Sequence, residues 1–369
     1  MIDWTASMQQ TFEYYTVDPG TWKDVHKLTT VRSCTINRDA NSETLGSATI
    51  DTTETLDEGY IRVYLIANQN GITEKHPLGT FLVQTPTFDF DGRKRNSSLD
   101  AYTPLLELKE KLTPLGFYVP KEDDILKRAY EKVSEFARAP VVRRTVTNDD
   151  SLYKLLYDFV ADPNDTWLSY LSALISNAEC VFDLDETGQI LFAPKQDVKS
   201  MQPVWTYTDD NSSILQPKIT MNRDMYGVPN EVEVVYTTSG KYYSCKAQNN
   251  DPNSPTSIIN RGRILSYRDT NPSLYSVDEH YRQENPDGDY TESQIEAYAN
   301  KKLSELSSVE YTLSYTHGYC PVRLGDCVRM NYNRAGLKNI KAKVISQSIK
   351  CEPGCPVTEQ AIFTTNLWR

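Results

Sequence analysis

Two carboxylates in the stretch CVFDLDETG, residues 180–188, stand at a spacing that could support phosphoryl transfer. An apolar run ends in Asp183, and Asp185 and Thr187 follow at alternate positions. A carboxylate can attack a phosphoryl group, and a second carboxyl group nearby can act as a general acid, both beside a magnesium ion. Whether they do so depends on the elements that hold Asp183 in place.

The elements expected around this stretch do not suit that chemistry. Haloacid-dehalogenase-like phosphatases, whose opening motif has this spacing, need the nucleophile at the carboxyl end of a strand in a doubly wound parallel sheet. Downstream the sequence predicts strand after strand with one helix, and the possible metal pair Asp209 and Asp210 follows too soon for the βα units required. The run QILFAP, residues 189–194, instead pairs back across a glycine turn. We therefore predict an exposed hairpin tip.

Metal sites are not predicted either. A calcium loop that began at Asp183 would need a bidentate Glu at its twelfth position, where Pro194 stands. Four of the seven cysteines fall in the predicted C-terminal barrel: Cys320, Cys327, Cys351 and Cys355. Their spacing lacks the CxxC knuckle, so free or paired barrel cysteines are the prediction, with zinc as the alternative. An odd cysteine count without a secretory signal favours folding in a reducing cytosol.

The remaining titratable residues form no catalytic constellation. The four histidines, His26, His76, His280 and His317, are scattered along the chain, and His317 in YTHGYC is expected at a strand end rather than as a base. There is no G-x-S-x-G elbow and no phosphate-binding glycine loop. We predict no catalytic, cofactor-binding or metal-binding residue, no cofactor and no enzyme activity.

Composition excludes several other classes. The net charge of −11 argues against a nucleic-acid surface, and the one basic run, GRKR at 92–95, is expected in a hairpin loop. No apolar run approaches the ~20 residues of a membrane-spanning helix, so no membrane insertion is expected. The 24 tyrosines and 19 prolines indicate a β-rich protein with many turns.

The order of patterns predicts a mainly β chain with an α+β insert. Short β-prone runs over 1–105 predict a first β-barrel domain, and 106–148 forms a helical connecting segment that includes a helix in 123–138. A small helix-helix-hairpin module at 149–200 would contain helices over 150–160 and 166–179, the second capped by Asp165. Residues 201–369 would form a second β-barrel domain with one packed helix, at 292–306.

The C-terminal stretch YTHGYCPVRLGDCVRMNY is followed by GLKNIKAKVISQSIKCEPG and a final strand. This pattern resembles the last domain of phage baseplate hub proteins, in which a p-l-r-x-G-D-x-V strand leads into an a-k-V-I-s-q strand and a hairpin. The matching residues are Pro321, Arg323, Gly325, Asp326, Val328, Val344 and Ile345. The stretches VRSCTINRDANSETLGSATI and HPLGTFLVQTPTFD resemble the first barrel of the same family.

The resemblance implies a structural protein. In that family three subunits, each with two tail-tube-like barrels, form a pseudo-sixfold ring that acts as a symmetry adaptor. The implied partners are the other copies in a homotrimer, the tail tube protein, the central spike or tail-tip protein, the tape measure protein and the baseplate wedge proteins. DNA would pass through during ejection without specific binding, and an acidic lumen would repel its phosphates. The protein would lie in the virion tail baseplate after assembly in the host cytoplasm.

Two other classes stay open. One is an enzyme, either the phosphatase with Asp183 and Asp185 or a hub-associated hydrolase that serves as a tail lysin. The other is a monomeric carbohydrate-binding β protein, in which Tyr and Trp side chains stack on sugars. Loss of activity in Asp183→Asn would identify the phosphatase, and a chain that never trimerises would speak against the hub.

Overall fold

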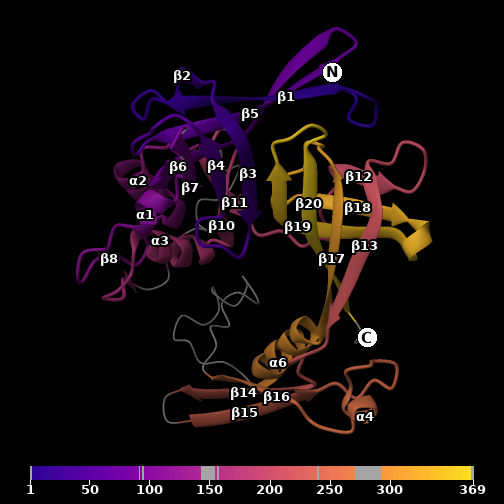
Figure 1. The fold of residues 1–369 in the computed structure, drawn as a ribbon. Helices are drawn as coiled ribbons and strands as arrows, with labels where there is room; N and C mark the ends of the chain where they lie inside the picture. Colours follow the sequence, from indigo (N-terminus) through magenta and orange to yellow (C-terminus); the bar gives the residue numbers. More distant parts are fainter. Residues whose placement is uncertain are drawn as a thin grey trace. The chain divides into compact units, whose positions relative to one another are not determined.

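The computed structural model describes residues 2–90, 92–93, 95–142, 154–155, 158–238, 241–270 and 292–366. The fold is mainly β, as predicted, and large antiparallel sheets dominate it (Figure 1). The chain forms two compact units: Met1–Ile219 with Ser314–Ala361, and Thr220–Leu313 with Ile362–Arg369. The first unit therefore contains segments from both ends of the sequence.

The first barrel occupies the N-terminal part of the first unit. Its strands are β1 (Gln9–Val17), β2 (Asp24–Leu28), β3 (Val31–Asp39), β4 (Gly46–Thr52), β5 (Tyr60–Gln69), β6 (Ile72–Phe90) and β7 (Arg95–Tyr102). They pair antiparallel in the order β3-β4-β7-β6-β5-β1-β2. Side chains alternate between core and surface, as in β4, where Ala48 and Ile50 are buried and Thr49 is exposed. The sequence predicted β3 to β7 but not β1 and β2, whose residues lack a clean apolar alternation.

A small α+β module follows. Its elements are α1 (Leu106–Lys109), β8 (Tyr118–Val119), α2 (Ile125–Phe136), β9 (Phe159–Val160), α3 (Trp167–Ser176), β10 (Cys180–Leu184) and β11 (Ile190–Pro194). On α2, Ile125, Ala129 and Val133 recur at helical spacing and are fully buried. Phe136 stacks on Trp167 of α3 with ring centroids 4.6 Å apart. These contacts form the core that supports the β10–β11 hairpin.

The helix expected over 150–160 is wrong for the residues that the structure describes there. Leu155 is buried, its N–H donates to the carbonyl of Asp123 and its own carbonyl accepts from Glu122. Phe159–Val160 forms β9, which pairs with β8. Residues 150–153 and 156–157 lie outside the described part. Pairing with a distant segment therefore outweighs the local helical periodicity.

The cap of α3 also differs from expectation. Thr166, rather than Asp165, is the N-cap: its hydroxyl accepts from the N–H of Ser169, and the Ser169 hydroxyl accepts from the Thr166 N–H. This is a capping box with Ser in the place of the usual Glu or Gln. Asp165 supports it from outside by accepting a hydrogen bond from the Ser169 hydroxyl.

The second barrel is built mainly from the C-terminal part of the chain. Its strands are β12 (Trp205–Thr208), β13 (Leu215–Asp224), β17 (Ser308–Gly318), β18 (Cys327–Tyr332), β19 (Leu337–Lys350) and β20 (Pro356–Asn366), with the short helix η3 (Asn333–Ala335) between β18 and β19. β19 pairs antiparallel with β3 of the first barrel, from Ser346↔Asp39 to Lys350↔Thr35. One hydrogen-bonded sheet therefore runs through both barrels.

The second unit has its own sheet and core. Its elements are β14 (Glu231–Thr238), β15 (Lys241–Gln248), α4 (Ile258–Arg261), β16 (Ser266–Thr270) and α6 (Glu292–Leu306). Ile295, Ala299 and Leu303 of α6 pack on Val232 and Val234 of β14. The helix expected on the second barrel is thus present, but its apolar face is buried by this separate three-stranded sheet.

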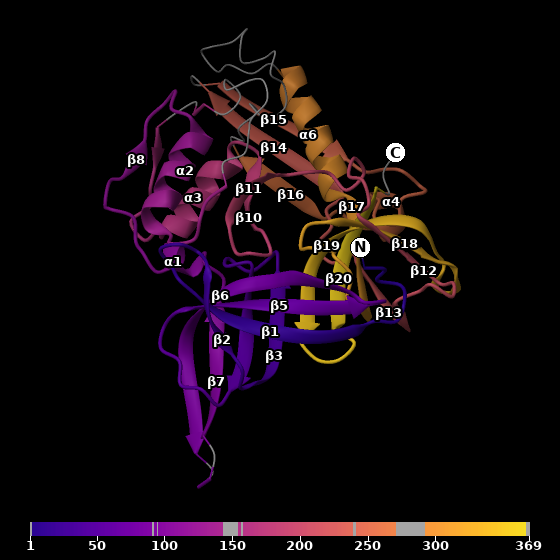
Figure 2. The ribbon, with the colours of Figure 1, turned by 90° about the horizontal axis from the view of Figure 1, so that it is seen from above.

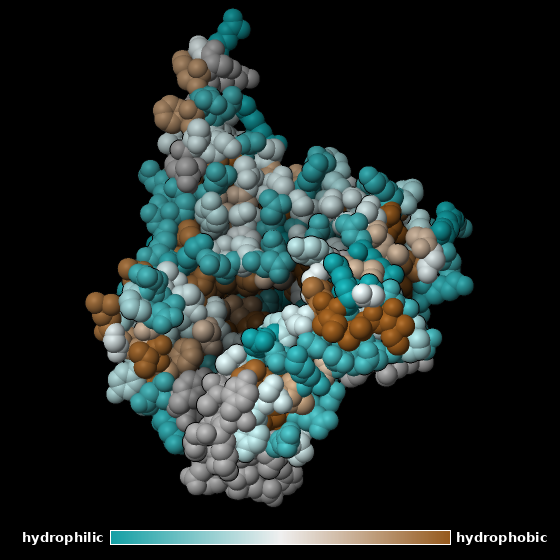
Figure 3. All heavy atoms as spheres, turned by 90° about the horizontal axis from the view of Figure 1, so that it is seen from below, coloured by the Kyte–Doolittle hydropathy of each residue, from teal (hydrophilic) through white to brown (hydrophobic). Residues whose placement is uncertain are grey.

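The end of the β6–β7 hairpin projects away from the other strands of the first barrel (Figure 2). Phe88 and Phe90 near this end are 60% and 67% exposed. Of the basic run at 92–95, Gly92 and Arg93 lie between the two strands, as expected for a hairpin loop, and Arg95 begins β7. Figure 3 shows one face of the surface as mixed polar and apolar, with apolar side chains gathered in small patches. Among the described residues no helix is long and apolar enough to cross a membrane.

Candidate functional site

The tip of the β10–β11 hairpin carries the motif that raised the question of phosphoryl transfer. Asp185 lines a small cavity, but its carboxylate is engaged locally: its Oδ1 accepts hydrogen bonds from the N–H and hydroxyl of Thr187 and from the N–H of Gln189, all at 2.8 Å. This is an Asx-type turn, in which a side-chain carboxylate takes the place of backbone acceptors and holds Asp185–Gln189 in a tight reversal. The second carboxylate of the motif is therefore committed to local structure.

The hairpin tip is docked on the first barrel, so the prediction of an exposed tip is wrong. The carbonyl of Thr187 accepts from the hydroxyl of Thr80 at 2.8 Å, the indole N–H of Trp22 at 3.0 Å and the guanidinium of Arg62 at 3.2 Å. Gly188 follows with φ +79°, and a Cβ added there would lie 2.7 Å from Cβ of Thr80. A left-handed glycine is thus required both by the turn and by the contact.

Arg62 is the residue of this contact that the sequence analysis missed. It is 5% exposed on β5, forms an ion pair with Asp24 at 3.0 Å, and donates through Nε to the hydroxyl of Thr80 at 2.8 Å. A signal was present, because an arginine interrupts the apolar run YIRVYLIA, and a buried charge needs partners. The partners themselves lie far away in sequence.

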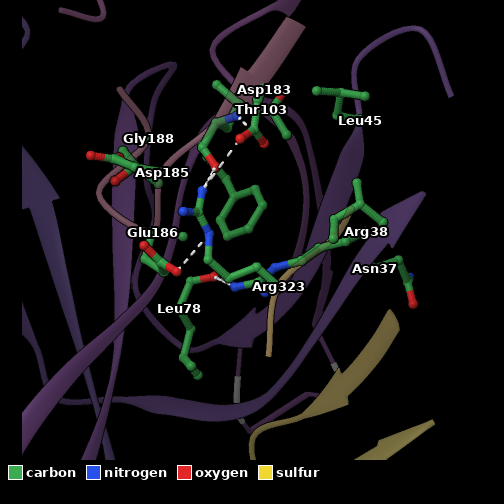
Figure 4. A pocket seen from close by; sticks show the side chains of 15 residues that line it. Asn37, Arg38, Leu45, Leu78, Thr103, Asp183, Asp185, Glu186, Gly188 and Arg323 are labelled. Carbon is green, nitrogen blue, oxygen red and sulfur yellow. Dashed lines mark hydrogen bonds and ion pairs between the residues drawn. The ribbon is translucent and has the colours of Figure 1, made fainter. Parts of the chain in front are cut away.

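On its other side the tip contacts the second barrel through Arg323, which lies in the loop before β18 (Figure 4). Its guanidinium donates to the carbonyl of Leu184 at 2.6 Å, binds Glu186 at 2.8 Å and lies 3.7 Å from Asp183. The next residues hold this loop in place: Asp326 accepts from the N–H of Arg323 at 2.8 Å. Residues that carried the hub-like motif therefore join the second barrel to the hairpin.

Burial raises the pKa of Asp183, and the charge of Arg323 and a hydrogen bond from the Leu184 N–H oppose this shift in part. β10 pairs antiparallel with β11 in a two-stranded sheet, not with parallel strands. Asp183 therefore lies beside an arginine in a joint between elements, without the parallel-strand context on which the phosphatase chemistry depends. The arrangement can fix three parts of the chain against one another.

We expect Asp185→Ala to lower the free energy of unfolding by about 1–3 kcal/mol, because the turn loses three hydrogen bonds to a charged acceptor. Asp185→Asn keeps a side-chain oxygen at the same position and should lose clearly less. Urea unfolding of both variants measures the difference. Equal stability of Asp185→Ala and the wild-type chain would show that the turn does not depend on this carboxylate.

Two cavities flank Arg323, of about 50 Å³ and about 200 Å³. Both are also lined by Arg38 and Glu186. Arg38 donates to the side-chain oxygen of Gln347 at 2.9 Å and to the carbonyl of Leu78 at 2.7 Å, while Arg323 is paired with Glu186. The cations have protein partners, so the spaces suit ordered water in a joint between the two barrels.

The interior of the second barrel holds a buried polar network centred on Glu359 of β20. Its carboxylate, fully buried, accepts from the hydroxyls of Tyr315 at 2.7 Å and Tyr207 at 3.1 Å and from the amide of Gln347 at 2.5 Å. His317 Nε2 lies 3.3 Å from the same carboxylate, and Tyr207 also contacts Nε2 of His317 at 3.1 Å. Through Gln347, which accepts from Arg38, the network reaches the first barrel.

The charges in this network favour an ion pair. Burial alone would lower the pKa of His317, but hydrogen bonds to Cys320 and Glu359 and the Glu359 charge raise it to about 10. Burial likewise opposes ionisation of Glu359, but the hydrogen bond and charge of His317, together with hydrogen bonds from Gln347 and Tyr315, hold the pKa of Glu359 below its usual value. His317, expected only at a strand end, is therefore a structural cation on β17.

The four cysteines expected in the second barrel lie in three places. Cys320 joins the Glu359 network, Cys327 lies on β18, and Cys351 and Cys355 lie near Cys34 of the first barrel. In the described part of the chain no three His, Cys, Asp or Glu side chains come together as a metal-binding group. His26 and His76 lie beside Glu54 and Glu74, and His280 is outside the described residues.

The topology places the chain in a fold class: its fold is similar to that of phage tail proteins and of a protein from a VgrG-containing complex. The tail protein from Neisseria meningitidis MC58 is similar over 97% of this chain and 98% of that one, with 13% identity and a TM-score of 0.65. The 43 kDa tail protein of prophage MuSo2 from Shewanella oneidensis is similar over 97% of this chain and 99% of its own, with 9% identity and a TM-score of 0.61.

A Francisella PdpA–VgrG complex is also similar, with a TM-score of 0.57 and 9% identity over 96% of this chain and 52% of that chain. No family model matches the sequence, and no curated protein matches it. At these identities the likeness establishes the fold. It agrees with the hub resemblance noted in the sequence, where the motif residues around Arg323 and Asp326 form the joint between barrel and hairpin.

Proposed function

We propose that the chain is a structural virion protein, the baseplate hub of a tailed phage or a related contractile particle. The observation that carries the proposal is the pairing of β3 with β19, which joins two tail-type barrels of one chain into one sheet. Three such chains would supply six barrels, the number that a sixfold tail tube presents at its end. The hub would thus be a homotrimeric, pseudo-sixfold ring.

The joint at the β10–β11 tip supports a mechanical role. Arg62 of the first barrel and Arg323 of the second both bind the same hairpin, so the two barrels are held by hydrogen bonds and ion pairs in addition to strand pairing. A ring that transmits force between tube and spike needs its barrels to keep a constant orientation. In this role the carboxylates of the motif are structural, and no enzyme activity is assigned to them.

The partners follow from this role. One face of the ring would bind the tail tube protein, the other the central spike or tail-tip protein, with the tape measure protein and wedge proteins as further neighbours. Exposed apolar side chains fit a chain that is buried further in an assembly. On the small α+β module these are Leu112, Leu115, Tyr118 and Val160. The net charge of −11 fits a channel through which DNA passes without being held, in a virion assembled in the host cytoplasm.

Mass photometry of the purified chain, alone and with the tail tube protein of the same particle, tests the proposal. We expect a species of three chains, in one or both conditions, and a ring with six similar lobes in negative-stain images. A chain that stays monomeric at every concentration and with tube protein would overturn the hub. Binding of that monomer to a glycan array would favour the carbohydrate-binding alternative, and cleavage of peptidoglycan would favour the lysin.

A further inference from the structure

Two cysteines that belong to different barrels face each other across the β3–β19 pairing. Strand β19 pairs with β3 from Ser346↔Asp39 to Lys350↔Thr35. The next residues opposite each other in this register are Cys351 and Cys34. The backbone extends the ladder to this pair, because the N–H of Cys351 donates to the carbonyl of Cys34 at 2.9 Å. Directly opposite residues of an antiparallel pair project their side chains to the same side of the sheet.

The backbone separation of this pair allows a disulfide once the two Cβ atoms, about 4.5–5.5 Å apart in such pairs, move to the spacing of about 3.5–4.5 Å that the bond needs. Hydrogen-bonded antiparallel partners have Cα atoms about 5.5 Å apart, within the range of about 4.4–6.8 Å that disulfides span. The two thiols already interact: hydrogen bonding to Cys351 is the main cause that raises the pKa of Cys34, and the hydroxyl of Tyr14 contacts both. Both cysteines are free thiols in the structure.

We propose that Cys34 and Cys351 form a disulfide under oxidising conditions, which covalently joins the first barrel to the second. The bond itself is independent of the proposed function. Its use, as a staple that closes after the particle leaves the reducing cytosol, rests on that function. It would close a loop on the order of 300 residues, and closing a long loop is where a crosslink removes most entropy from the unfolded chain.

The two thiols have different access to an oxidant. Cys34 is 4% exposed, whereas Cys351 is partly exposed just after β19. With glutathione disulfide as oxidant, the thiolate of Cys351 attacks one sulfur and releases a first glutathione thiol. The thiolate of Cys34 then attacks the sulfur of Cys351 and releases the second. One protein disulfide and two glutathione thiols result, and the two cysteine protons end on those thiols.

Cys355 is the competing partner. It is fully buried, and the charge of the Cys351 thiolate contributes, after burial, to its raised pKa. It follows Cys351 in a turn in which its N–H donates to the carbonyl of Glu352 at 2.8 Å. A Cys351–Cys355 bond would close a small loop within the second barrel and would join nothing to the first.

Non-reducing peptide mapping by mass spectrometry of the full chain, after incubation with glutathione disulfide, identifies the pair. We expect a Cys34–Cys351 peptide that dithiothreitol removes, together with a rise in Tm of about 5 °C or more. The rise should vanish in Cys351→Ala and persist in Cys327→Ala, a matched control on β18. A Cys351–Cys355 peptide, or stable glutathione adducts without any protein disulfide, would overturn the proposal.

If Cys351→Ala fails to fold, the peptide map of the wild-type chain still decides, because it needs no variant. The trimer measurement reports separately on the hub. A trimer without the disulfide would contradict only the staple, and the disulfide in a chain that never trimerises would contradict only the hub.

Discussion

Replacing Glu359 by Gln is expected to lower the free energy of unfolding by about 3–5 kcal/mol, the largest loss among the changes considered. The carboxylate is fully buried, accepts three hydrogen bonds and neutralises His317 at 3.3 Å. An amide leaves the imidazole without a counter-charge, and its NH2 group must replace either the oxygen that accepts from Tyr207 and Tyr315 or the oxygen that accepts from Gln347. Urea unfolding monitored by circular dichroism measures the loss.

The pH dependence gives this prediction a second readout. The pKa of His317 rises from 6.5 to about 10, so its stabilising contribution is complete below pH 6.5 and is lost as the pH rises toward 10. The pKa of Glu359 falls below 4.5, so its contribution is present above pH 4.5 and is lost only in stronger acid. The difference between wild type and Glu359→Gln should therefore be largest between about pH 4.5 and 6.5 and should shrink toward pH 10.

Glu352→Gln is the matched control for this change. Glu352 is exposed in the turn before β20, and its substitution should alter stability by at most about 0.5 kcal/mol. If Glu359→Gln behaves like Glu352→Gln, or if its deficit is the same at every pH, the buried ion pair is not a source of stability.

Gly188→Ala is expected to lower the free energy of unfolding by about 3 kcal/mol, the second large effect. The residue has φ +79°, where an alanine is strained by about 1–2 kcal/mol. The new methyl would also lie 2.7 Å from Cβ of Thr80, which is buried and held by Arg62 and the Thr187 carbonyl, so overpacking adds about 1–3 kcal/mol. The tip must then lift from the barrel or distort it.

Gly116→Ala separates the two causes. Gly116 has φ +73°, but no atom lies within 4 Å of the added Cβ, so this variant should lose stability only through backbone strain. Hydrogen exchange of the peptide over 180–194 should accelerate in Gly188→Ala and stay unchanged in Gly116→Ala. Equal losses of stability in both variants would mean that the contact between hairpin and barrel contributes nothing.

The local hydrophobic pattern was sufficient to predict a strand or helix where one face of that element packs on a single core. The run VRSCTINRD predicted β3, and DDILKRAYEKVSEFAR predicted α2, because each pattern repeats the period of its backbone. In the hub-like motif the expected strand is β18, which begins only at Cys327, after the turn that contains Arg323 and Asp326. In these segments the neighbouring residues along the chain already supply the reason for the structure.

Local pattern failed where a distant partner competes with it. Residues 150–160 have helical spacing, yet Leu155 exchanges backbone hydrogen bonds with residues 122–123. The helix at 292–306 was predicted correctly, but its apolar stripe does not specify which sheet covers it. In the structure β14 and β15 cover it. An amphipathic helix must bury its apolar face, but its sequence does not specify which element that face packs against.

The sequence by itself determined the β-rich class and most strand and helix positions. It also showed a resemblance to hub proteins, and the solved tail proteins with a similar fold agree with that resemblance. Only the tertiary structure decided the meaning of CVFDLDETG. Whether Asp183 and Asp185 are catalytic depends on Thr80, Arg62 and Arg323, which surround the hairpin from positions far away in the chain. Spacing along a strand sets which side a carboxylate faces, but the groups that meet it there come from long-range packing.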